Sequence, residues 1–119
     1  MNFHNVVSGI AATNLGGQEY KAVKITSGGL ALASAGDRAI GVLVTGADAG
    51  RAVDVFLKGT GLHEVVIGND TAIASGDLLD LGSTPGTFVE HGGQGTPVAV
   101  AWDAAPAGSS GGRIHVVLL

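Results

Sequence analysis

Short apolar runs separated by glycine-bearing turns restrict the fold of this chain more than any other feature. Residues 36–61, GDRAIGVLVTGADAGRAVDVFLKGTG, show the pattern: two such runs with hardly a side chain suited to chemistry. The chain has 21 glycines, and no apolar stripe at the helical period extends beyond about two turns. Because glycine disfavours helices, we expect strands instead.

Clusters of Gly, Asn, Asp and Ser separate the apolar runs at intervals of about ten residues, a spacing typical of small all-β barrels and sandwiches. The predicted fold is therefore all-β, a small β-barrel or sandwich of about eight or nine short strands with an extended N-terminal arm. The predicted strands are 20–26, 30–33, 38–44, 52–58, 62–67, 78–81, 87–91, 98–102 and 113–119.

The 119 residues are enough for one domain but too few for two. Residues 1–19 are small and polar and keep no period, whereas residues 20–119 hold all the predicted strands. We therefore expect an N-terminal arm over residues 1–19, which becomes ordered only against a partner, and a single β-barrel-like domain over residues 20–119.

Alternation of apolar and polar residues is clearest in the strand 52–58. Val53, Val55 and Leu57 are predicted to point to one face. Phe56 then falls on the polar face, where either another element covers its ring or the ring belongs to a contact surface. The last predicted strand carries apolar residues to the end of the sequence, and its inward residues are predicted to be Ile114, Val116 and Leu118.

Composition and charge exclude several classes of function. Hydrophobic residues make up 45% of the chain but aromatic residues only 4%, so burial between subunits would help to stabilise a core of small side chains. A net charge of −4 with only six Lys and Arg residues provides no basic face for nucleic acid. The chain has no cysteine, and therefore no disulfide or thiolate zinc site. It also has no basic leader and no uncharged stretch of about 18 residues, so we expect a protein made in the cytoplasm without a membrane segment.

Two four-residue segments resemble each other within the chain. SAGD at residues 34–37 and ASGD at residues 74–77 each place a Gly-Asp turn before an apolar strand. Asp in such a turn accepts hydrogen bonds from backbone N–H groups, and Gly takes a positive φ. The sequence leaves two interpretations open, chance similarity of two turns or a duplicated strand-turn-strand unit.

Four histidines, His4, His63, His91 and His115, raise the question of a metal site. His63 and Glu64 are neighbours on a predicted strand, so their side chains leave on opposite faces and cannot share one ion. The other three histidines lie on separate segments, whose convergence the sequence leaves open. We expect no metal site and solvent-facing histidines.

Candidate catalytic and cofactor-binding residues are explained by structural roles. Asp77, Asp80 and Glu90 contain the carboxylates that acid–base catalysis needs, but turn and edge positions account for them. No Gly-x-Ser-x-Gly segment occurs, and residues 59–61 do not continue into a phosphate-binding loop. Lys58 ends a strand, unlike the modified lysine at a hairpin tip of biotin and lipoyl carriers. We therefore predict no enzyme activity, no catalytic residue and no cofactor.

Trp102 is the single tryptophan, at the end of a predicted strand. A large aromatic side chain in such a position either covers the core or anchors an interface. Trp102 and Phe56 are therefore the candidate interface residues of the domain.

Three segments of the sequence together resemble a known family. Residues 38–61 contain a Gly-Val strand, a glycine turn and an alternating strand, and residues 73–77, IASGD, precede a strand and Gly86. Residues 97–119 contain PVAVAWDAA, a Gly-Gly turn and RIHVVLL. Over about residues 20–119, this combination resembles the small capsid decoration, or cement, proteins of tailed bacteriophages.

The resemblance implies a compact β-barrel-like protein on the outer surface of an expanded phage head, commonly as a homotrimer at local threefold positions. It also implies that the major capsid protein is the partner, that an N-terminal arm reaches onto it, and that no nucleic acid or membrane is bound. The residues of the arm expected to contact the capsid are Phe3, Val6, Val7 and Ile10.

The predicted function is thus that of a structural virion protein that stabilises the head by bridging neighbouring major capsid protein subunits. Many modest contacts repeated around a shell would add up through multivalency. Two alternatives remain open. One is a sugar-binding or small-ligand-binding β module that uses Trp102, and the other is a different phage surface component, such as a head-fibre or tail-associated domain.

Overall fold

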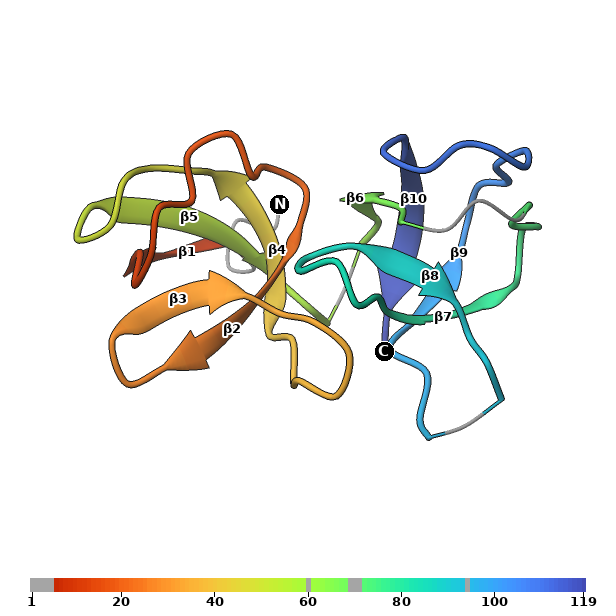
Figure 1. The fold of residues 1–119 in the computed structure, drawn as a ribbon, viewed down its shortest axis with the longest axis horizontal. Coiled ribbons are helices and arrows are strands. Elements are labelled where there is room, and N and C mark those ends of the chain that lie inside the picture. Colours follow the sequence, from red (N-terminus) through yellow and green to blue (C-terminus); the bar gives the residue numbers. More distant parts are fainter. Residues whose placement is uncertain (1–5, 60, 69–71, 94) are drawn as a thin grey trace.

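The computed structural model describes residues 6–59, 61–68, 72–93 and 95–119, and in them the chain forms ten strands and no helix (Figure 1). The described residues therefore contain no helix that could span a membrane. The all-β prediction is confirmed. The strands are β1 (Val6–Ile10), β2 (Ala22–Thr26), β3 (Gly29–Leu32), β4 (Gly41–Thr45), β5 (Ala52–Leu57), β6 (His63–Val66), β7 (Leu78–Leu81), β8 (Phe88–Glu90), β9 (Ala99–Ala101) and β10 (Arg113–Leu118).

Nine of these strands, β2 to β10, lie within or next to the predicted ranges. The additional strand is β1, in the segment predicted to be an arm. It pairs antiparallel with β5, from Val6 opposite Phe56 to Ile10 opposite Ala52. Residues 6–10 of the predicted arm thus pair with a strand of the chain itself.

The strands form two antiparallel five-stranded sheets that lie side by side as two lobes (Figure 1). The first sheet has the order β1-β5-β4-β2-β3 and the second the order β6-β10-β9-β7-β8. Each sheet curls toward closure through one parallel bridge, Ala11 with Leu30 in the first and Ile67 with Phe88 in the second.

The two lobes have the same topology. Adding five to each strand number of the first sheet gives the order of the second, and the closing bridges join equivalent positions. We call residues 6–58 the first half and residues 62–119 the second half. The strand registers align, among others, Val7 with His63, Ala22 with Leu78, Val42 with Val100 and Phe56 with Val117.

Backbone hydrogen bonds outside the strands repeat as well. The Gly50 N–H donates to the Ala11 carbonyl at 2.8 Å, and the Gly111 N–H donates to the Ile67 carbonyl at the same distance. Both glycines have a positive φ, 83° and 91°, a conformation that side chains with a Cβ disfavour. The turn before the last strand of each half is therefore built in the same way.

A second repeated turn precedes β2 and β7. Tyr20 has a φ of 69°, and its counterpart Gly76 has a φ of 90°. Their N–H groups donate to the carbonyls of Leu43 and Ala101, at 2.8 and 2.7 Å. Among the described residues, Tyr20 is the one non-glycine residue with a positive φ. It adopts the same backbone conformation as Gly76 in the second half.

Each half also carries an irregularity where its fourth strand ends. In the first half the register between β4 and β5 shifts between Leu43 and Thr45, which makes Val44 the extra residue. In the second half the N–H groups of Trp102 and Asp103 both donate to the His115 carbonyl, as in a β-bulge. Val44 and Trp102 are thus equivalent.

The two Gly-Asp turns noted in the sequence have the same chemistry but not equivalent positions. An Asp37 oxygen accepts the Ser34 N–H at 2.9 Å, and an Asp77 oxygen accepts the Ala74 N–H at 2.8 Å. The first turn, however, lies between β3 and β4, whereas the second precedes β7, the counterpart of β2. The chain does contain a duplicated unit, but these two turns do not mark it.

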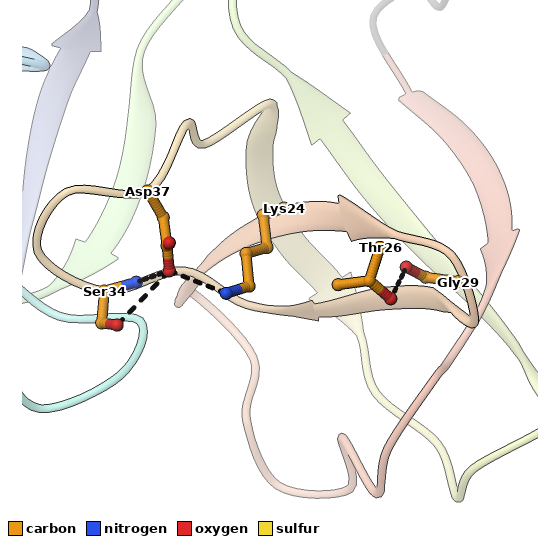
Figure 2. A network of polar contacts seen from close by, with 5 residues as sticks. All are labelled: Lys24, Thr26, Gly29, Ser34 and Asp37. Carbon is orange, nitrogen blue, oxygen red and sulfur yellow. Dashed lines mark hydrogen bonds and ion pairs between the residues drawn. The ribbon is translucent and has the colours of Figure 1, made fainter.

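The Asp37 turn is tied to the neighbouring strand by an ion pair. Lys24 Nζ donates to the same Asp37 oxygen at 2.9 Å (Figure 2). The Lys24 hydrogen bond, with that of the Ser34 N–H, lowers the pKa of Asp37 below its usual value. Farther along the same hairpin, the Thr26 hydroxyl donates to the Gly29 carbonyl at 2.8 Å.

Buried apolar side chains of the described residues form two groups. The first lies inside the first half and consists of Ala11, Leu15, Val23, Leu30, Leu43, Val53 and Val55. The second fills the second half and includes three side chains of the first half, Ala22, Ala33 and Val42. The inward positions predicted from alternation are confirmed for Val53, Val55, Ile114, Val116 and Leu118.

Backbone hydrogen bonds join the two halves across the β7–β8 hairpin. The Gly86 carbonyl accepts the Ala22 N–H at 2.9 Å, and the Gly86 N–H donates to the Ala33 carbonyl at 2.6 Å. The Gly82 carbonyl accepts the Ala35 N–H at 3.0 Å. The halves are therefore connected by main-chain pairing as well as by shared apolar contacts.

Candidate interaction surfaces

Strand β1 presents apolar side chains to solvent. Val6, Val7 and Ile10 are between 39% and 51% exposed, whereas the fourth predicted arm residue, Phe3, lies outside the described residues. β1 forms the end of the first sheet, with β5 as its ladder partner among the described residues. Its other edge meets β3 at the Ala11–Leu30 bridge, and before that bridge it has no ladder partner among the described residues, so this part of the edge can take part in main-chain pairing.

A groove of about 270 Å³ runs between the two halves, and we call it the junction groove. One of its walls comes from the start of β2 and from β4 and β5, and the other from β6 and β10. The residues that line it are Tyr20, Val42, Leu43, Val44 and Phe56 on the first half and Leu62, His63, Glu64 and His115 on the second.

Phe56, a candidate interface residue, lies in this groove. Its ring stacks on the His63 imidazole with ring centroids 4.0 Å apart and planes inclined by 33°. Of the two interpretations of Phe56 from the sequence, the structure supports coverage by another element, here the beginning of the second half. Phe56 is half-buried and contributes to the contact between the halves.

His63 is buried, contrary to the expectation that the histidines face solvent. Its Nε2 lies 2.9 Å from the Leu57 carbonyl oxygen, a distance at which the Nε2–H donates. Its Nδ1 is buried without a partner in the described residues. Burial lowers the pKa of His63 below its usual value because desolvation disfavours the charged imidazolium.

Arg113 contacts residues on both sides of the junction groove. Its guanidinium lies 4.4 Å from the centre of the Tyr20 ring, and its Nε lies 3.2 Å from a Glu64 carboxylate oxygen. The Val66 N–H donates to the Tyr20 carbonyl at 3.0 Å. The end of β6 therefore pairs with the first half through backbone as well as side-chain contacts.

Trp102 does not cover the core, which was one of its two interpretations. Its side chain is 61% exposed and lies in a shallow apolar hollow on the outer face of the second sheet. We call this surface the Trp102 face, and it consists of Ser75, Gly76, Val100, Ala101, Trp102 and Val117. Leu78, which pairs with Val100 on the neighbouring strand, is also 43% exposed.

The other described histidines form separate pairs with aspartates. His91 Nδ1 lies 2.8 Å from an Asp80 oxygen, and His115 Nδ1 lies 2.8 Å from an Asp103 oxygen. The side-chain and backbone hydrogen bonds from His115 lower the pKa of Asp103. Among the described residues, no three metal-binding side chains come together.

The carboxylates considered for acid–base catalysis have structural positions. Asp77 accepts the N–H of its own turn, and Asp80 is engaged by His91. Glu90 is exposed at the end of β8. Of these, only Asp80 has a second titratable group in hydrogen-bond contact, so the three do not form a catalytic pair in the described structure.

A larger hollow of about 510 Å³ lies between the halves near the last residues of the chain. Asp37, Arg38 and Lys58 contribute its charged groups, but the Asp37 carboxylate is already paired with Lys24. Lys58 follows β5 and is not at a hairpin tip. These residues line the boundary between the two packed halves and do not form a recognisable catalytic arrangement.

No family model and no curated protein matches the sequence. Among solved structures, the fold is similar to that of the N base of the head fiber protein gp8.5 of bacteriophage phi29. The TM-score is 0.74 at 20% sequence identity, and the match covers 96% of this chain and 92% of that chain. At this identity the likeness shows a shared fold, over both halves.

Proposed function

We propose that the chain is a structural protein of a phage virion that decorates the outer surface of the head and stabilises it by bridging neighbouring capsid subunits. The observation that carries this proposal is the shared fold with a phage head-fiber base over nearly the whole of both chains. The resemblance of residues 20–119 to capsid decoration proteins points to the same class of protein.

The surfaces of the molecule support a binding role. The exposed apolar side chains of the β1 edge and of the Trp102 face lie on different halves, so one chain can contact two other copies at once, as a homotrimer requires. Two β-barrel-like halves joined by main-chain hydrogen bonds form a stiff unit. We propose a homotrimer on the head, with the major capsid protein as its partner.

A second candidate, the base of a head fibre, is favoured by the same structural match. The two roles differ in whether this chain is the whole protein or one segment of a longer fibre protein. The intact mass of the protein isolated from virions distinguishes them: 11.7 kDa corresponds to the chain alone, whereas a larger mass with this segment at one end corresponds to a fibre.

Sugar binding through Trp102 is less well supported. A sugar site of the expected kind would combine the Trp102 ring with convergent carboxylates in a concave pocket. The hollow at the Trp102 face is lined by small and apolar residues and no acid. The neighbouring Asp103 is paired with His115.

Co-sedimentation with expanded heads of the phage that encodes the chain tests the proposal. We expect binding that saturates at a fixed number of chains per head, and heads that stay intact at higher temperature with the protein than without it. An acidic β-protein of similar size serves as the control for nonspecific adsorption. Absence of saturable binding, or binding that leaves the thermal stability of the heads unchanged, would contradict the proposal.

A further inference from the structure

Within one chain, the outer face of the first half is covered by the beginning of the second half. Tyr20, Val44 and Phe56 form part of the first wall of the junction groove, and Leu62 and His63 approach it from the second half. The stack of Phe56 on His63 and the hydrogen bond at Tyr20 hold this contact.

The second half carries an equivalent face. All five residues of the first wall have their counterparts in the Trp102 face. The pairs, in order along the chain, are Tyr20 and Gly76, Val42 and Val100, Leu43 and Ala101, Val44 and Trp102, and Phe56 and Val117.

Burial differs between the two faces as a missing partner would require. Ala22 is fully buried and Val42 is 3% exposed, because the second half covers them. Of their counterparts, Leu78 is 43% exposed and Val100 is half-buried. Val44 of the first face remains 43% exposed. The part of the face around Ala22 and Val42 is therefore covered in the first half, whereas its equivalent in the second half is uncovered within the described part of the chain.

In the part of the chain that the structure describes, the complementary surface is uncovered as well. The counterparts of Leu62 and His63, which cover the first face, are Val6 and Val7 at the start of β1. Val6 is 47% and Val7 39% exposed. Each chain thus has one contact between equivalent surfaces already made, and the two surfaces of a second such contact left open.

We propose that a second copy of this chain docks the β1 edge of its first half onto the Trp102 face, repeating the contact between the two halves of one chain. The contact is heterologous, because it joins two different surfaces. It makes a second copy, and not the capsid protein, the partner of Val6, Val7 and Ile10.

The equivalent contacts define the geometry. Val7 of one copy lies against Val117 of the other, as His63 lies against Phe56 within the chain. The Ile10 N–H of one copy donates to the Gly76 carbonyl of the other, as the Val66 N–H donates to the Tyr20 carbonyl. The proposal does not depend on the virion role, since it concerns only contacts between copies.

Disulfide trapping tests the contact, because the chain has no cysteine of its own. Val7→Cys and Val117→Cys are made as separate variants and mixed under mild oxidation. We expect a disulfide-linked dimer in the mixture, several-fold more than in either variant alone. The matched control mixes Val117→Cys with Ala49→Cys, since Ala49 is exposed in the loop between β4 and β5 and lies outside both surfaces.

Two results of the trapping experiment would overturn the proposal. One is linkage of Val7→Cys to itself as readily as to Val117→Cys, which indicates contact between identical surfaces. The other is a yield no higher than that of the Ala49→Cys control.

Sedimentation provides an independent measurement without oxidation. We expect the unmodified chain to sediment above its monomer mass of 11.7 kDa, and Val7→Glu and Trp102→Glu each to sediment as monomers. Ala49→Glu, at an exposed position in the loop between β4 and β5, should keep the assembly. An unmodified chain that stays monomeric at high concentration would overturn the contact between copies while leaving head binding to its own test.

Discussion

Gly41 shows how closely the strands of the first half approach one another. It lies in β4 between β2 and β5, and a Cβ there would overlap the Phe56 carbonyl oxygen and lie 2.9 Å from the Leu57 Cα. Because both obstacles are backbone atoms of a paired strand, they cannot move aside as a flexible side chain would.

We expect Gly41→Ala to lower the free energy of unfolding by about 1–3 kcal/mol through this overlap, measured by urea denaturation. Gly92→Ala is the matched control, since a Cβ there meets nothing within 4 Å and its φ is not positive. Equal stabilities of the two variants would show that β4 shifts without cost.

His63 makes the stability of the protein depend on pH. Burial lowers its pKa in the folded state, whereas the unfolded chain takes up a proton near pH 6.5. The free energy of unfolding is therefore not reduced by His63 above pH 6.5, where the imidazole is neutral in both states. It falls as the pH drops from 6.5 toward the folded-state pKa, because only the unfolded chain takes up the proton.

Urea denaturation at several pH values between 7.5 and 5 measures this effect. The free energy of unfolding should fall by at most about 1.4 kcal/mol per pH unit from this one proton. His63→Phe keeps a ring beside Phe56 but cannot titrate, so it should remove that part of the slope. Parallel pH profiles for the two proteins would contradict the account.

Some residue positions followed from the sequence and others did not. Alternation placed Val53, Val55 and Val116 correctly because a strand exposes alternate faces whatever surrounds it. It did not place Phe56 and Trp102, because the element that covers the outer face of a strand comes from elsewhere in the chain. Phe56 is covered by the second half, and Trp102 is not covered in the described structure.

At the scale of elements, β1 is the strand that the sequence did not predict. Its sequence VVSGI lacks a clear alternation, and all its residues but Gly9 are exposed. What makes it a strand is its pairing with β5. After β1, Ala11 and Leu15 enter the core of the first half, so this segment supports the fold as well as presenting a surface.

Leu15 is 1% exposed in that core. Leu15→Ala should lower the free energy of unfolding by about 2–5 kcal/mol through the cavity it leaves, measured by urea denaturation. Leu62→Ala, at a residue 39% exposed, is the control and should cost much less. A Leu15→Ala protein as stable as the original would place residues 11–15 outside the core.

At the scale of the whole molecule, the core of the second half depends on the first half. Ala22, Ala33 and Val42 of the first half complete the core of the second. The sole tyrosine, Tyr20, lies in the first half, and the sole tryptophan, Trp102, in the second. These two residues provide one fluorescent probe for each half.

We expect tyrosine and tryptophan fluorescence to report one common urea transition, because the core of the second half includes side chains of the first and main-chain hydrogen bonds join the two. Far-UV circular dichroism should give the same midpoint. Two separate midpoints would show that the halves unfold independently.

The duplication could not be recognised from the sequence, although the fold class could. Equivalent positions hold different residues, such as Tyr20 and Gly76, or Val44 and Trp102. The β7–β8 hairpin is also two residues longer than its counterpart, so the spacing between equivalent positions is not constant. Some equivalent positions do keep the same residue, such as Val42 and Val100 or Gly50 and Gly111, but these identities are scattered among differences, whereas the backbone geometry is kept throughout the strands.

Electron cryomicroscopy of expanded heads incubated with the purified protein tests the central claim most directly. The account predicts density for two β-barrel-like lobes per chain on the outer surface of the head, placed across the boundaries between capsid subunits. Heads whose outer surface is identical with and without the protein would contradict it.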